Sequence, residues 1–147
     1  MKKHGLALGL WCAMGLTLTA QTPDGKEPWR VDLTSKEEGV RMKLDLYEES
    51  VDVPGMDVFG PMHGFLGGKI YGVWMVTSFS IKNDSTAIIR FSNDLGSDTQ
   101  ECILKHKWDG SYQLELKGGV AVKKVVDRKL VKIKNLHTFE SKRPVTQ

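Results

Sequence analysis

This chain of 147 residues has very little cysteine and none of the short motifs that assemble common active sites. Its two cysteines are Cys12 and Cys102, and only Cys102 remains if the N-terminal segment is cleaved, so an intramolecular disulfide is not expected. Also missing are a His-Glu-x-x-His motif, paired cysteines, a Gly-x-Ser-x-Gly elbow, a phosphate loop and a dinucleotide fingerprint. We therefore predict no metal, no cofactor and no enzymatic activity, with stability that comes from packing.

Long apolar runs are absent except at the N-terminus. There, Lys2 and Lys3 precede an apolar stretch over 6–18 that is too short to span a bilayer, and Ala20 offers a cleavage site before Gln21. This pattern predicts a signal peptide over 1–20, export to the periplasm or beyond, and a soluble mature chain. A lipid anchor on Cys12 is the minority alternative, because bulky Trp11 stands where lipoprotein signals carry a small residue.

Residues 21–147 have the length of a single domain, with a flexible N-terminal end. Their apolar residues recur with the period of two that is typical of half-buried strands, as in the run from Ser111 to Lys117, where Tyr112, Leu114 and Leu116 are apolar. Turn residues separate such runs. The predicted strands cover residues 29–34, 39–53, 69–82, 86–92, 99–108, 111–118, 120–126 and 129–140.

Such a series predicts an all-β fold, an antiparallel up-and-down meander of about eight strands that closes as a barrel. A two-sheet β-sandwich fits the same pattern and stays open as an alternative. A helix after Ser35 is a second competitor, because Ser35 to Glu38 spells a capping box. Gly39 and the cleaner alternation that follows it favour a strand.

One connection, over residues 54–68, is long and unusually apolar for a loop. Its side chains can cover the mouth of a barrel and close on an apolar ligand, form a patch for a protein partner, or fold back as a plug on the core. The candidate binding residues in this loop are Met56, Phe59, Met62, His63 and Phe65.

Two polar residues near the C-terminus extend this list. Asn135 and His137 share the parity of Val131, Ile133 and Phe139, so in a continuous strand they would point into the barrel and contact a ligand. A core histidine bonded to backbone groups is the simpler interpretation. The carboxylates Glu48, Glu49 and Asp52 are interpreted as solvated residues at a strand end rather than as a catalytic acid and base.

The last third of the chain is basic: residues 105–147 carry eleven Lys or Arg against four Asp or Glu. These side chains protect an edge strand or form a surface for an anionic partner, whereas nucleic acid is a poor fit without interleaved aromatic residues. The candidate anion or partner surface comprises Lys123, Lys124, Arg128, Lys129, Lys132 and Lys134.

The signal ending Leu18-Thr19-Ala20-Gln21-Thr22 resembles signals of Bacteroides-type bacteria. Together with the alternating body, the chain resembles their small exported β-proteins, some of which are calycin-like barrels. The resemblance implies an envelope protein that is not an enzyme, and it carries over no site residue.

Two functions fit these observations. The first is an exported carrier of a small apolar or amphipathic molecule inside the barrel, gated by residues 54–68. The second is a protein-interaction module of the cell envelope, such as an inhibitor or immunity protein, that uses the long loop or the basic face. A wide internal cavity favours the carrier, and a filled interior with exposed apolar residues favours the module.

Overall fold

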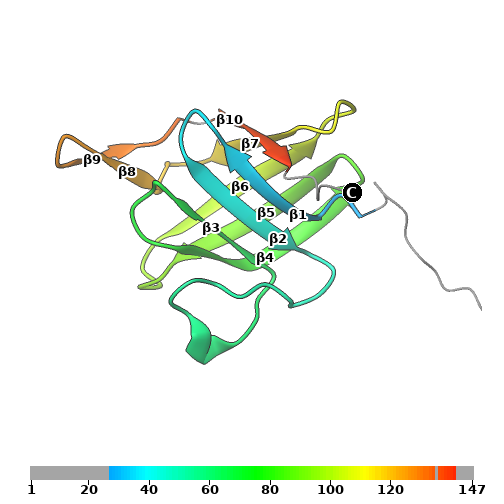
Figure 1. Ribbon diagram of the computed structural model, residues 1–147, viewed down its shortest axis with the longest axis horizontal. Coiled ribbons are helices and arrows are strands. Elements are labelled where there is room, and N and C mark those ends of the chain that lie inside the picture. Colours follow the sequence, from blue (N-terminus) through cyan, green and yellow to red (C-terminus); the bar gives the residue numbers. More distant parts are fainter. Residues whose placement is uncertain (1–26, 135, 142–147) are drawn as a thin grey trace, which may run out of the picture.

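The computed structural model describes residues 27–134 and 136–141. Within them, most of the alternating segments form strands (Figure 1). A single short 3-10 helix, η2 (Asp57–Phe59), interrupts them within this part of the chain. No helix here is long and apolar enough to cross a membrane. The strands are β1 (Arg30–Ser35), β2 (Val40–Asp45), β3 (Gly64–Gly68), β4 (Trp74–Asn83), β5 (Thr86–Asn93), β6 (Thr99–His106), β7 (Tyr112–Lys117), β8 (Lys123–Val126), β9 (Lys129–Lys132) and β10 (Leu136–Ser141).

Eight of the strands form a closed antiparallel barrel in the order β1-β10-β7-β6-β5-β4-β3-β2. The barrel closes where β10 pairs with β1, with Leu33 opposite Ser141. Strands β8 and β9 form a separate hairpin that projects from the barrel between β7 and β10 (Figure 1). The predicted closed meander is confirmed, and the sandwich alternative is wrong because closure leaves the barrel no free edge.

The segment after Ser35 is a turn followed by a strand, so the helical alternative is wrong. Gly39 donates its backbone N–H to the carbonyl of Ser35 over 2.8 Å, and its φ of 68° is an angle that favours glycine. The strand that follows was predicted to continue to residue 53 but ends at Asp45. There the Asp45 carboxylate accepts hydrogen bonds from the N–H groups of Tyr47 and Glu48, which turn the chain away from the barrel.

Strand β3 was not predicted, because its sequence, Gly-Phe-Leu-Gly-Gly, lacks alternation and was placed in the long loop. The glycines are required by close packing against β2. A Cβ on Gly64 would collide with the carbonyl oxygen of Lys43, and one on Gly68 with that of Gly39. Glycine therefore marks a close approach of two strands here rather than a loop.

The barrel interior is filled by side chains. One continuous cluster of buried residues, among them Leu33, Met42, Leu66, Phe91 and Leu114, runs through it. A barrel of eight strands is just wide enough for its own side chains to fill the interior, in line with this packing.

The end of the barrel where β7 begins is closed by two aromatic residues. Trp29 and Tyr112 pack edge to face with ring centroids 6.4 Å apart. The Tyr112 hydroxyl donates to the carbonyl of Pro28 over 2.6 Å, and burial raises the pKa of Tyr112 to about 12. These contacts join the first described residues to β7, which is separated from β1 by β10 alone.

Cys102 lies fully buried in the barrel core, and burial raises the pKa of its thiol. We expect this thiol to be inert to a thiol-specific reagent in the native protein, because the reacting species is an exposed thiolate. The measurement uses a Cys12→Ser chain, in which Cys102 is the only thiol. Reaction should begin only on addition of denaturant, and rapid reaction without denaturant would contradict the assigned core.

Candidate functional site

The loops divide between the two ends of the barrel. The β1–β2 turn, the β3–β4 loop, the β5–β6 loop and the β8–β9 hairpin meet at one end, which we call the hairpin end. The long connection over residues 46–63 and the β4–β5 and β6–β7 turns lie at the opposite end, which we call the loop end (Figure 1). The two predicted candidate surfaces are therefore at opposite ends of the molecule.

At the loop end, the long connection folds back on the outer face of the barrel. Phe65 points outward from β3 and is covered by Val51 and Val53, with Met56 and Met62 half-buried around them. This second small core is separate from the core of the barrel interior, where the neighbouring Leu66 packs. The segment therefore covers a side of the barrel rather than its mouth, and its most exposed apolar side chains lie at the tip, with Phe59 68% exposed.

His63 fastens the base of the same loop. Its Nδ1 lies 3.0 Å from the carbonyl oxygen of Asp45, its Nε2 lies 3.7 Å from Glu49, and its ring meets Phe79 edge to face at 4.8 Å. The backbone bridge between Val51 and Met62 closes the loop above it. These contacts hold the loop shut against the barrel.

Asp45 organises the turn that begins the long loop. Its carboxylate accepts hydrogen bonds from the Ser50 hydroxyl at 2.6 Å and from Arg30 at 3.1 Å, besides the backbone N–H groups of Tyr47 and Glu48. Burial opposes ionisation of this carboxylate, but the hydrogen bonds outweigh it and lower the pKa of Asp45. A charged carboxylate with this many donors is a structural element of the loop.

The remaining polar candidates do not converge on a site. Glu48, Glu49 and Asp52 are exposed. Among the residues that the structure describes, no three His, Cys, Asp or Glu side chains are grouped so as to hold a metal ion. Asn135 lies outside those residues, and for His137 the structure describes the backbone, which pairs with Leu114.

The predicted continuous strand over 129–140 is wrong. Residues 129–132 form β9 in the separate hairpin, and the chain enters the barrel again only as β10. Val131 is exposed on the hairpin, whereas Ile133 and Phe139 are buried, so the parity that grouped them does not run through the segment. The basic residues consequently lie on a projecting hairpin and its base instead of on a barrel wall. Alternation alone could not reveal this break, since both strands keep the period of two.

The β8–β9 hairpin mixes basic and apolar residues on both faces. Val125 pairs with Leu130, and Lys123 with Lys132, on one face; Lys124 pairs with Val131, and Val126 with Lys129, on the other. Val125 is 59% exposed and Leu130 is 50% exposed. Apolar side chains that remain this open on a two-stranded sheet are typical of a contact surface.

The hairpin is held in a defined position. Lys124 Nζ lies 2.6 Å from Oε2 of Glu38, a buried carboxylate in the β1–β2 turn, and Lys134 Nζ lies 3.7 Å from the other oxygen of Glu38. At the tip, Asp127 and Arg128 have φ angles of 52° and 67°. Two positive φ angles are those of a type I′ turn, whose twist matches that of paired strands.

Gln100 connects the barrel to the segment that leads into the hairpin. Its side chain is buried, its Oε1 accepts the N–H of Ala121 over 2.6 Å, and its Nε2 donates to the carbonyl of Lys117 over 2.7 Å. Gln100 shares the parity of Cys102 and Leu104, so the alternation of β6 places it on the buried face, but nothing in the sequence identifies its two backbone partners.

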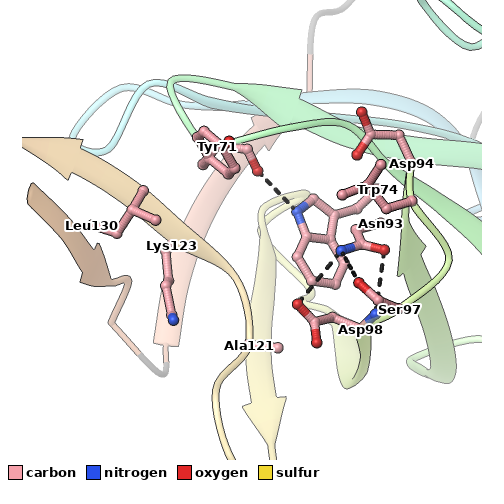
Figure 2. A pocket seen from close by; sticks show the side chains of 10 residues that line it. Tyr71, Trp74, Asn93, Asp94, Ser97, Asp98, Ala121, Lys123 and Leu130 are labelled. Atoms are coloured by element: carbon pink, nitrogen blue, oxygen red, sulfur yellow. Dashed lines mark hydrogen bonds between the residues drawn. The ribbon is translucent and has the colours of Figure 1, made fainter.

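A pocket of about 170 Å³ lies between the hairpin and the β5–β6 loop (Figure 2). Trp74 forms its floor and donates its indole N–H to the carbonyl of Tyr71 over 3.3 Å. Asn93 shapes the loop side through hydrogen bonds to Ser97 and Asp98. The lining residues are Tyr71, Trp74, Asn93, Asp94, Leu95, Ser97, Asp98, Ala121, Lys123 and Leu130.

The pocket has acidic groups on one side and a basic group on the other. In Figure 2, Asp94 and Asp98 come from the barrel side, while Lys123 and Leu130 face them from the hairpin. Around the pocket, Tyr71 and Leu95 are exposed by 63% and 83%. The sequence pointed to Lys123 as part of a basic surface but not to this pocket, because its lining residues come from separate predicted strands and turns.

Comparison with known proteins adds no relative: no protein-family profile, no curated protein and no solved structure matches the chain.

Proposed function

We propose that this protein is an exported binding module that recognises another protein through its hairpin end. The observation that carries the proposal is the contrast between a barrel interior filled by its own side chains and a cluster of open apolar residues around the pocket. A carrier needs an internal cavity that buries most of its ligand, commonly about 300 Å³ or more. The described pocket is smaller and lies at the surface.

Several features favour the hairpin end over the loop end. The long loop packs Val51 and Val53 against Phe65, so its most exposed apolar side chains are Val58 and Phe59 at the tip. At the hairpin end, Tyr71, Leu95 and Leu130 surround a concave pocket with charges of both signs. Open apolar residues beside fixed polar groups are the usual composition of a protein-binding surface.

The export part of the proposal rests on the basic, apolar and small-residue pattern of residues 1–20. An eight-stranded barrel is also in keeping with the resemblance to calycin-like exported proteins of Bacteroides-type bacteria.

The test is native mass spectrometry of the protein purified from the cells that naturally make it. We expect a complex with a second protein that is lost in the Val125→Ser/Leu130→Ser double variant. Both side chains are exposed, so their replacement should change the free energy of unfolding by no more than about 0.5 kcal/mol per site.

Trp108→Ser is the matched control, because Trp108 is 98% exposed and lies in the β6–β7 turn at the loop end. It should leave the complex intact. A small molecule retained equally by wild type and the hairpin variant would instead establish the carrier, and loss of the complex in Trp108→Ser would place the surface elsewhere.

A further inference from the structure

We infer that the outer edge of β9 is a docking edge for an extended acidic segment of the partner protein, which adds a strand to the β8–β9 hairpin. The inference rests on the proposed function and names the chemistry of its partner. It starts from the pairing of the strands: across the described residues, β9 pairs with β8 and with no other strand. One side of its backbone is therefore available for pairing.

The register shows which groups this edge presents. The two residues that flank a two-residue turn, here Val126 and Lys129, form a hydrogen-bonded pair, and such pairs alternate along an antiparallel ladder. The bond from the N–H of Ile133 to the carbonyl of Val122, at 3.3 Å, continues this alternation at the base. The N–H and C=O groups of Leu130 and Lys132 accordingly point to the open side.

The charge of the hairpin selects the partner. Residues 123–134 contain six basic residues and one acidic residue. Two of the lysines, Lys124 and Lys134, face Glu38, but within the described chain no carboxylate lies within ion-pair distance of Lys129 or Lys132. These two lysines stand at the two ends of the β9 edge, where opposite charges on an added strand stabilise the pairing.

The same lysines disfavour a second copy of this chain as the occupant. Antiparallel pairing of β9 with itself through this edge matches residues an even number of positions apart, so Lys132 would lie opposite Lys132, Leu130 or Arg128 of the second copy, on a strand whose only charged side chains are basic. Like charges at opposed positions destabilise a sheet. A strand-forming partner that is acidic at these positions meets no such repulsion.

The β9 sequence Lys-Leu-Val-Lys predicts the complementary order acidic, apolar, apolar, acidic in the partner. Because this order is symmetric, it fits both directions of the added strand. The apolar residue beside Leu130 lies on the face that lines the pocket, where Tyr71 and Leu95 can cover it. The hairpin is preorganised for this pairing by the Glu38–Lys124 contact and the type I′ turn.

Fluorescence anisotropy with the full chain and a labelled short peptide of central sequence Glu-Val-Val-Glu tests this inference at physiological ionic strength. We expect binding that weakens about tenfold in the Lys129→Gln/Lys132→Gln variant. Lys105→Gln/Lys107→Gln, an exposed pair on β6 and its following turn at the loop end, is the matched control and should bind like wild type.

Two further peptides separate strand addition from charge attraction. Backbone N-methylation of the two valines removes donors and blocks close pairing, so it should abolish binding, and a Lys-Val-Val-Lys peptide should not bind. Equal binding of the N-methylated peptide would overturn the inference. Complete displacement of the Glu-Val-Val-Glu peptide by dextran sulfate, together with equal binding of the N-methylated peptide, would show attraction to a basic surface alone.

Sedimentation measures whether the chain forms dimers. A dimer fraction that is larger in Lys129→Gln/Lys132→Gln than in wild type would also overturn the inference, since it would assign the edge to a second copy. Failure of these peptides would overturn the inference but not the proposed function, whose own test is loss of the complex in the Val125→Ser/Leu130→Ser variant, whatever segment the partner uses.

Discussion

Leu114→Asp should destabilise the protein by roughly 3 kcal/mol or more, whereas Gln113→Asp on the same strand should change the free energy of unfolding by no more than about 1 kcal/mol. Leu114 is fully buried among the residues that fill the barrel, so a carboxylate there has neither water nor a partner. Gln113 lies on the opposite face of β7 and is half-buried beside exposed Lys105. Urea denaturation of the purified variants measures both changes.

Leu114→Ala provides a second readout if the aspartate variant does not fold. Loss of the buried side chain should cost about 3 kcal/mol through the cavity that it leaves. Equal destabilisation by the two aspartate substitutions would show that the faces of β7 are assigned wrongly. A stable Leu114→Ala protein with an unchanged midpoint would show that the interior is not packed.

Phe65→Ala should cost about 3 kcal/mol, and Phe59→Ala should cost no more than about 0.5 kcal/mol, although both residues belong to the same apolar segment. Phe65 is 4% exposed and contacts the loop core, with the Arg41 guanidinium 5.8 Å from its ring centroid. Phe59 stands open at the tip of the loop. Thermal melts of the single variants separate the two roles.

The pair also tests what the loop covers. Loss of Phe65 should release residues 46–63 from the outer face of the barrel, which hydrogen exchange would detect as faster exchange at Val51 and Met62, whose N–H groups bond to each other's carbonyls. Slow exchange at both positions in Phe65→Ala, together with a large loss of stability, would mean that Phe65 supports the barrel instead of the loop.

The buried face of a strand was predicted best from the sequence where the opposite face is exposed to solvent. In β7, Tyr112, Leu114 and Leu116 are buried as their alternation predicts. The reasoning failed at β3, where glycines and a strand covered on both faces removed the alternating signal. It also failed between β9 and β10, where two strands with the same period have different environments.

The candidate residues divide in a similar way. Methionines 56 and 62 lie together with Phe65, as their shared segment suggested, but on the outside of the barrel. The basic residues from Lys123 to Lys132 lie together because they are neighbours along one hairpin. The pocket residues Tyr71 and Asp98 meet Leu130 only after the barrel has closed, so no local spacing connects them.

The sequence by itself determined that the protein is all-β, that turn residues separate its strands and, for most strands, which face is buried. These properties depend on residues a few positions apart, through the period of two and the turn chemistry. Only the tertiary structure decided that β1 meets β10 to close the barrel, that the long loop covers its outer wall, and that the basic residues stand on a projecting hairpin beside a pocket. Each of these depends on contacts between residues far apart in the chain, whose register is set by the packing of the whole barrel.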